Sequence, residues 1–129
     1  MKVKLLMLVC TVSVLSVSAQ ELSHDIAAKR AYYQKERAEL MATRKANESA
    51  SHKERIAILE RAEQCIQAAK TKEAYRACEE KEKVEREAFH QKDKSKRDAN
   101  HAKAEALKKQ RDADKETIKA KRESHKSMQ

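Results

Sequence analysis

The sequence predicts an all-α protein, and three features of its composition lead to this prediction. The 129 residues include no glycine and no proline, so tight β-hairpin turns and glycine-rich phosphate-binding loops lack the residue type on which they depend. Charged residues make up 40% of the chain. The few large apolar residues recur mainly at helical spacing. We therefore expect an elongated antiparallel helical hairpin, or a three-helix bundle or coiled coil, with a charged C-terminal helix or frayed tail.

The first nineteen residues have the features of a secretory signal peptide, which predicts that they are removed. Lys2 and Lys4 precede an apolar run from Leu5 to Val17. A membrane-spanning helix needs about 20 apolar residues, and this run is shorter. The small residue Ala19 then completes a signal-peptidase site. We expect an exported protein, periplasmic or secreted, whose mature chain does not span a membrane.

The mature chain is expected to fold over residues 20–91 as a helical hairpin or small bundle. Only 11 of the 110 residues that remain after removal of the first 19 are Leu, Ile, Val or Phe, a share below the level of about 20% at which disorder becomes a serious alternative. This composition excludes a large core. Ser23 is a suitable N-cap for a first helix over 23–46.

Two further capping signals divide the rest of this segment. Ser51 and Glu54 form the pattern of a capping box, which predicts a break after residue 46 and a second helix over 51–69. Thr71 is a suitable N-cap for a third helix that starts at residue 72. The three helices would then be joined by two short turns.

Residues 92–129 have a different composition and carry most of the positive charge. They contain 13 basic and 7 acidic residues, a balance of +6, whereas residues 20–91 contain 15 and 14, a balance of +1. Leu107 and Ile118 are the only large aliphatic residues of this segment. We therefore expect a basic, charged helix or a partly disordered tail over 92–129.

Cys65 and Cys78 are the only cysteines of the mature chain. On a continuous helix their separation of 13 residues corresponds to about 20 Å, whereas a disulfide needs Cα atoms within about 7 Å. Export also implies an oxidising compartment. A turn between Thr71 and Lys72 would place the two cysteines at the same height on antiparallel helices. We therefore predict a hairpin closed by a Cys65–Cys78 disulfide, and an intermolecular disulfide remains an alternative.

The segment from Cys65 to Cys78, CIQAAKTKEAYRAC, resembles the cysteine-flanked hairpin of small exported all-helical bacterial proteins that have no assigned activity. The resemblance covers the signal peptide and about 40 residues around the hairpin, and its motif is not specific. It implies a periplasmic setting and no particular function.

A metal site is the chemical alternative to the disulfide, with Cys65, Cys78 and His90 as its candidate ligands. Zinc ligands usually occur as closely spaced pairs of cysteines or histidines, and the mature chain has no such pair. We therefore expect no metal and no other cofactor, and a metal-binding or metal-sensing protein is kept as an alternative function.

The sequence shows no catalytic constellation, because its carboxylates, lysines and histidines follow a solvated pattern. A catalytic group needs a partly buried pocket that shifts its pKa, and a thin helical fold offers none. We therefore expect a non-enzymatic protein. The basic segment lacks the aromatic residues that stack on bases, which argues against nucleic acid as its partner.

The leading expectation is an exported protein that binds a protein or an anionic component of the cell envelope through its helices. A holdase-like periplasmic chaperone is an alternative, and a homo-oligomer is compatible with either. The residues expected to form the contacts are the larger apolar and aromatic ones of the mature chain: Tyr32, Tyr33, Leu40, Met41, Tyr75 and Phe89.

Overall fold

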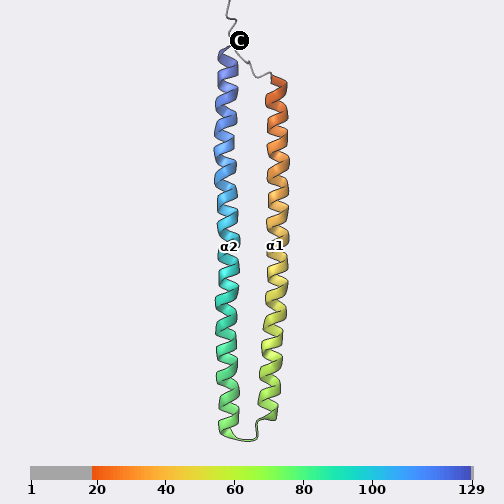
Figure 1. Ribbon diagram of the computed structural model, residues 1–129, viewed down its shortest axis with the longest axis vertical. Helices are drawn as coiled ribbons and strands as arrows, with labels where there is room; N and C mark the ends of the chain where they lie inside the picture. The colour runs from red at the N-terminus through yellow and green to blue at the C-terminus, as the bar shows by residue number, and fades with distance from the viewer. Residues whose placement is uncertain (1–18, 129) are drawn as a thin grey trace, which may run out of the picture.

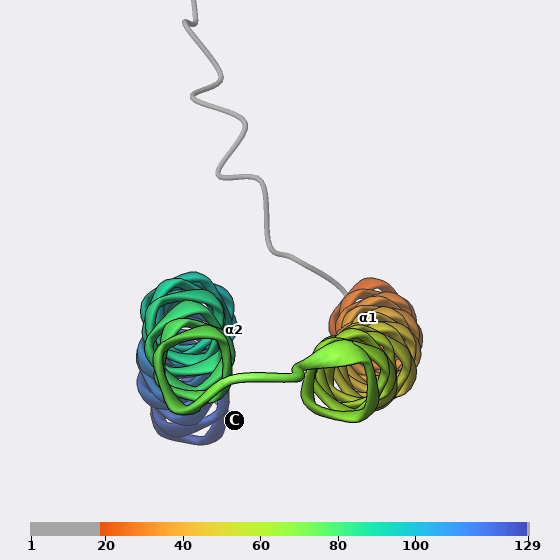
Figure 2. The same ribbon diagram turned by 90° about the horizontal axis from the view of Figure 1, so that it is seen from below.

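The computed structural model describes residues 19–128 and consists of two long helices that pack side by side (Figure 1). Helix α1 spans Ala19–Ala68, and helix α2 spans Lys72–Ser127. At 1.5 Å per residue, their 50 and 56 residues correspond to about 75 and 84 Å. The chain reverses direction between them, so the helices are antiparallel and form a single hairpin. The view along the helices shows the same two-helix arrangement (Figure 2).

This structure confirms the all-α hairpin, and it contains no third helix within residues 19–128. The signal peptide predicted for residues 1–19 lies, apart from Ala19, outside the described residues. No helix in the described part of the chain is long and apolar enough to cross a membrane.

The reversal takes place over three residues, 69–71, and it follows the predicted capping pattern. Thr71 has an extended backbone, with φ −131° and ψ 158°, and its Oγ1 accepts a hydrogen bond from the backbone N–H of Ala74 at 3.1 Å. This is the geometry of an N-cap. On the other side of the turn, the N–H of Ala69 donates to the carbonyl of Ile66 at 3.2 Å. Both helix ends at the turn therefore have partners for backbone groups that a helix leaves free.

The predicted disulfide geometry is confirmed by the positions of the two cysteines next to this turn. The sulfur atoms of Cys65 and Cys78 are within bonding distance, and their Cα atoms are 5.7 Å apart. Cys78 is buried, with 5% of its surface exposed. The cross-link therefore joins α1 and α2 at the closed end of the hairpin.

The predicted helix break at residues 47–51 is wrong, because α1 continues through this segment without interruption. Ser51 does not cap a new helix. It is buried between the helices, and its Oγ donates a hydrogen bond to the carboxylate of Asp93 on α2. Serine and asparagine cost at most about 0.7 kcal/mol each relative to alanine inside a helix, and the segment contains neither glycine nor proline. The contact with α2 therefore decides the conformation of this segment.

Residues 92–127 continue α2 and pack along α1 from about residue 54 to its N-terminal end. Lys92 pairs with Glu54 at 3.0 Å, and Lys121 pairs with Asp25 at 3.5 Å. Both pairs join the two helices. The basic segment is therefore a helical partner of α1 in this structure.

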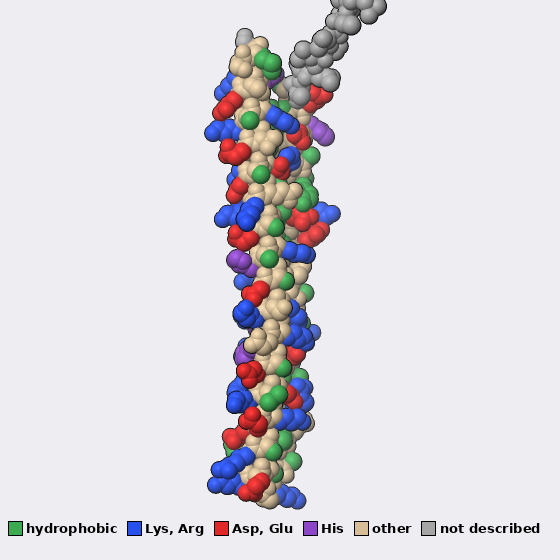
Figure 3. Space-filling model, turned by 60° about the vertical axis from the view of Figure 1, so that its left-hand side comes forward, with side chains coloured by type: hydrophobic (Ala, Val, Ile, Leu, Met, Phe, Trp, Pro, Cys, Tyr) green, Lys and Arg blue, Asp and Glu red, His purple; other side chains and the backbone are tan. Residues whose placement is uncertain are grey.

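The core of the hairpin lies between two helices and contains few buried apolar side chains. Among the described residues, the buried hydrophobic ones are Tyr33, Ile58, Cys78 and Phe89. Buried and half-buried residues of both helices recur mostly at intervals of three, four or seven along the line where the helices meet, and many of them are polar or charged. We call this line the seam. The space-filling view shows charged side chains of both signs along the whole length of the molecule, with hydrophobic side chains between them (Figure 3).

Candidate interaction surface

A groove follows one side of the seam in the half of the hairpin that lies away from the disulfide. It consists of two adjoining hollows of about 580 and 470 Å³, which share Tyr33 and Arg111. Apolar side chains form its floor, and cationic side chains of both helices form its rims. We call it the basic groove. Its floor residues are Ile26, Tyr33, Leu40, Met41, Ala104, Leu107 and Ile118.

The charged residues that line the basic groove are nearly all positive. Ten lysines and arginines line its two hollows, and Asp114 is the single carboxylate residue among the lining residues. The hollow on the other side of the same stretch of the seam is smaller, at about 250 Å³, and it is lined by Glu36, Glu39 and Lys103 as its charged residues. The excess of positive charge therefore belongs to one side of the hairpin.

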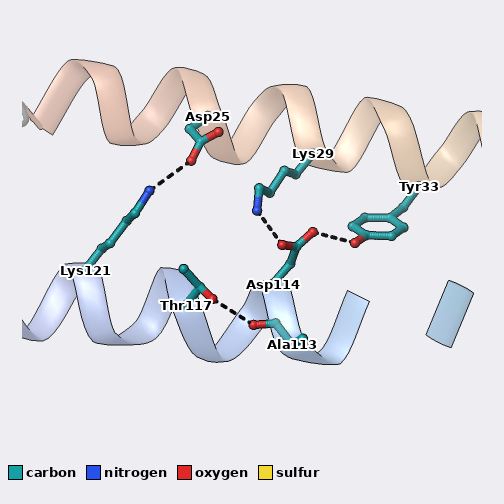
Figure 4. A network of polar contacts seen from close by, with 7 residues as sticks. All are labelled: Asp25, Lys29, Tyr33, Ala113, Asp114, Thr117 and Lys121. Atoms are coloured by element: carbon teal, nitrogen blue, oxygen red, sulfur yellow. Dashed lines mark hydrogen bonds and ion pairs between the residues drawn. The ribbon is translucent and has the colours of Figure 1, made fainter. Parts of the chain in front are cut away.

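Asp114 is engaged within the hairpin, where it pairs with Lys29, one of the ten lining cations, and leaves the others without a carboxylate partner among the lining residues. Its carboxylate accepts hydrogen bonds from Lys29 Nζ and from the Tyr33 hydroxyl, both at 2.5 Å (Figure 4). These two hydrogen bonds, with that from Lys29 the stronger influence, hold the pKa of Asp114 below its usual value. Lys29 and Tyr33 belong to α1 and Asp114 to α2, so the cluster also joins the helices.

Tyr33 is fixed in the floor of the groove by this cluster. Its side chain is buried, with 9% of its surface exposed. Burial, the hydrogen bond to Asp114 and the nearby negative charge of Asp114 together raise the pKa of Tyr33 to about 12, with burial the largest cause. The phenol therefore stays protonated and serves as a structural hydrogen-bond donor.

Several rim cations have no partner within the described part of the chain. Arg30, Arg37, Arg44 and Lys108 are exposed and form no hydrogen bond or ion pair with a described residue. Other rim residues are paired on their own helix: Arg97 with Asp93 at 3.3 Å, and Arg111 and Lys115 with Asp112 at 3.5 and 3.8 Å. The Nε atom of Arg111 is nevertheless buried without a hydrogen-bond partner. The groove thus offers donors that the hairpin itself leaves unused.

The six contact residues predicted from the sequence occupy different environments. Tyr33, Leu40 and Met41 line the basic groove. Tyr32 lines the hollow on the opposite side. Tyr75 is exposed near the closed end of the hairpin, where a hydrogen bond to Glu79 raises its pKa.

Phe89, the last of the six, is buried in the seam, with 5% of its surface exposed.

Sequence reasoning missed the rim arginines of α1. The signal that could have identified them is their spacing, because Arg30, Arg37 and Arg44 recur every seven residues.

The candidate metal ligands do not come together. The sulfur atoms of Cys65 and Cys78 are bonded to each other. His90 lies twelve residues from Cys78 on the same helix, which corresponds to about 18 Å. Within residues 19–128, no group of three or more histidines, cysteines or acidic residues has the geometry to hold a metal ion.

The basic groove combines an apolar floor with unpaired cations. Comparisons with protein-family models, curated proteins and solved structures found no match to this chain.

Proposed function

We propose that this protein is an exported, non-enzymatic helical hairpin that acts by binding a protein or an anionic envelope component along the basic groove. The observation that carries the proposal is the excess of ten lysines and arginines over one engaged carboxylate above an apolar floor. Such a surface has favourable interactions to offer that the hairpin does not use. Charged rims around an apolar centre are also the usual composition of a binding interface.

The titratable groups of the groove support binding rather than catalysis. Tyr33 and Asp114, whose pKa values are shifted, are hydrogen-bonded to each other and to Lys29 across the seam. Both groups are therefore held in the protonation state that stabilises the hairpin. Perturbed pKa values arise in structural networks as well as in active sites, and here the geometry of the pair accounts for the shifts.

One feature of the sequence and one of the structure support export. The signal-peptide pattern predicts removal of residues 1–19, and the structure places Cys65 and Cys78 where an oxidising compartment would join them. The closed end would then be covalently fixed in the mature protein. The groove lies at the other end, where the mature N-terminus would begin.

The proposal is tested by photo-crosslinking in a bacterium that expresses the full chain. A photoreactive amino acid replaces Met41, on the groove floor, or Lys53, an exposed residue that lines no groove hollow. Intact mass before and after alkylation establishes the mature N-terminus and the oxidised cysteines. We expect envelope adducts at position 41 and none at position 53.

Two results would contradict the proposal. A chain that stays in the cytoplasm with residues 1–19 attached would remove export. Absence of adducts at position 41 in the exported chain, at every growth phase sampled, would remove the groove as the binding surface. Adducts that are proteins, lipids or glycans are each compatible with the proposal, and their identity is taken up below.

A further inference from the structure

We infer that the basic groove binds an acidic amphipathic helix of a partner protein. This helix would lie along the hairpin as the third helix of a three-helix coiled coil. This inference rests on the proposed function and specifies the class of partner. The proposed function rests on the composition of the groove, whereas this inference rests on the spacing of the groove residues along the two helices.

Cations at intervals of seven residues line both rims. On α1 they are Arg30, Arg37 and Arg44, and on α2 they are Lys108, Lys115 and Arg122, with His101 one interval before Lys108. Seven residues are two helical turns, or about 10.5 Å. A helix that carries Glu or Asp at the same interval would meet a cation at every step on both sides. This is the arrangement of charges that flanks the apolar contacts of a coiled coil.

The floor of the groove has the same period. Ile26, Tyr33 and Leu40 follow one another at intervals of seven on α1, and Ala104 and Ile118 lie fourteen residues, or two such intervals, apart on α2. The apolar side chains of a third helix would pack between these positions, as knobs pack into holes. The α2 rim extends over 21 residues from His101 to Arg122, or about 31 Å. The inferred partner helix therefore has about three heptads.

Other occupants match fewer of these observations. A linear polyanion would use the cations but has no apolar face to cover the floor. A lipid would use both, but the two-turn period of the rims has no counterpart in a bilayer surface. A second copy of this chain would place ten lysines and arginines of one groove against ten of the other, and like charges in contact oppose binding.

The direct test measures binding of synthetic peptides to the exported, oxidised chain by fluorescence anisotropy and far-ultraviolet circular dichroism. The probe is a three-heptad peptide with Leu or Ile at the a and d positions and Glu at e and g. One control peptide has the same composition in scrambled order, and a second has Lys in place of Glu. Vesicles of anionic phospholipid serve as the third control.

We expect the acidic amphipathic peptide to bind and to gain helicity, and the scrambled and lysine peptides to bind at least about tenfold more weakly. The variant R37E/R44E/K108E should lose about tenfold or more in affinity for the acidic peptide and should gain affinity for the lysine peptide. The matched control K53E/K81E changes two exposed lysines outside the groove and should leave binding of the acidic peptide within about twofold.

The outcomes separate this inference from the proposed function. Equal binding of the acidic and scrambled peptides would overturn the inference in favour of a polyanion. Tighter binding of vesicles with the same dependence on the groove residues would overturn it in favour of a lipid surface. In both cases adducts at position 41 would still support the proposed function. Because Arg37, Arg44 and Lys108 are exposed and unpaired among the described residues, the triple variant should keep the helicity of the original chain.

Discussion

Removal of the disulfide tests how much of the stability of this narrow hairpin comes from its covalent link. The variant C65A/C78A deletes the bond and places a small apolar side chain at the buried position 78. The bond closes a loop of about 14 residues, and the chain-entropy model assigns about 3 kcal/mol to a loop of that length. Total stabilities of domains are about 5–15 kcal/mol, so the expected loss is a large fraction.

The magnitude can be converted to a melting temperature. An unfolding entropy of about 2.1 cal/mol/K per residue gives about 230 cal/mol/K for residues 19–128, the 110 residues of the hairpin. A loss of about 3 kcal/mol therefore lowers Tm by about 13 °C. Thermal unfolding followed by circular dichroism at 222 nm measures this shift for the oxidised chain and the double alanine variant at equal concentrations.

The matched control for this experiment removes a nearby interaction without opening the loop. Arg61 and Glu85 form an ion pair between the helices at 2.7 Å close to the disulfide, and R61Q should lower Tm by far less because exposed pairs contribute about 0–1 kcal/mol. A Tm of the double alanine variant within about 3 °C of the oxidised chain would refute the reasoning, because the unfolded chain would then gain little freedom when the bond is absent.

Three further predictions concern the seam. D114N should lower Tm more than D98N, because Asp114 links the helices whereas Asp98 pairs with Lys94 on its own helix. The pKa of Asp114 is lowered in the folded chain, so its contribution to stability is present above about pH 4 and is lost as the pH falls through the folded-state value. The dependence of Tm on pH in acid should therefore be weaker in D114N than in the original chain. Tyr33 should ionise near pH 12, above the pKa of a tyrosine in the unfolded chain, so its contribution to folding stability is complete below about pH 10 and is lost as the pH rises toward 12. A titration followed by ultraviolet absorbance should show a tyrosinate step near pH 12 that is absent in Y33F. S51A should cost about 1 kcal/mol through loss of the hydrogen bond to Asp93, and amide exchange should show protection across 47–51; rapid exchange there would indicate a turn.

The hairpin could be predicted from the sequence because local signals determine it. Thr71 has the residue type of an N-cap, and the spacing of Cys65 and Cys78 is compatible with a disulfide only if the chain reverses between them. These signals act over one or two turns of helix. They need no knowledge of which residues lie opposite one another.

The course of α1 could not be predicted in the same way. Ser51 and Glu54 have the local pattern of a capping box, but in the structure the Ser51 hydroxyl donates to Asp93, which is 42 residues away. A local rule does not include that partner. A prediction that ends the first helix at residue 46 leaves no continuous helix on which the whole of α2 could pack.

The candidate site depends on the same long-range pairing. Tyr33, Leu40 and Met41 were predicted as contact residues from their apolar character, and the structure places all three in the groove. The rims consist of arginines and lysines from two segments about 70 residues apart. Each segment alone has the charge pattern of a solvated helix, and their convergence is visible only when the antiparallel register is known.

The disulfide closes the hairpin at one end only, and this makes the two ends mechanically unequal. The helices cannot separate at Cys65 and Cys78, so thermal opening must begin at the other end, where α1 begins and α2 ends, and progress toward the bond (Figure 1). The free energy of local opening is therefore lowest near the termini. The basic groove occupies this end. A ligand that contacts both rims would hold the two helices together at the open end, as the disulfide does at the closed end. Amide hydrogen exchange would then slow from the open end of the hairpin inward.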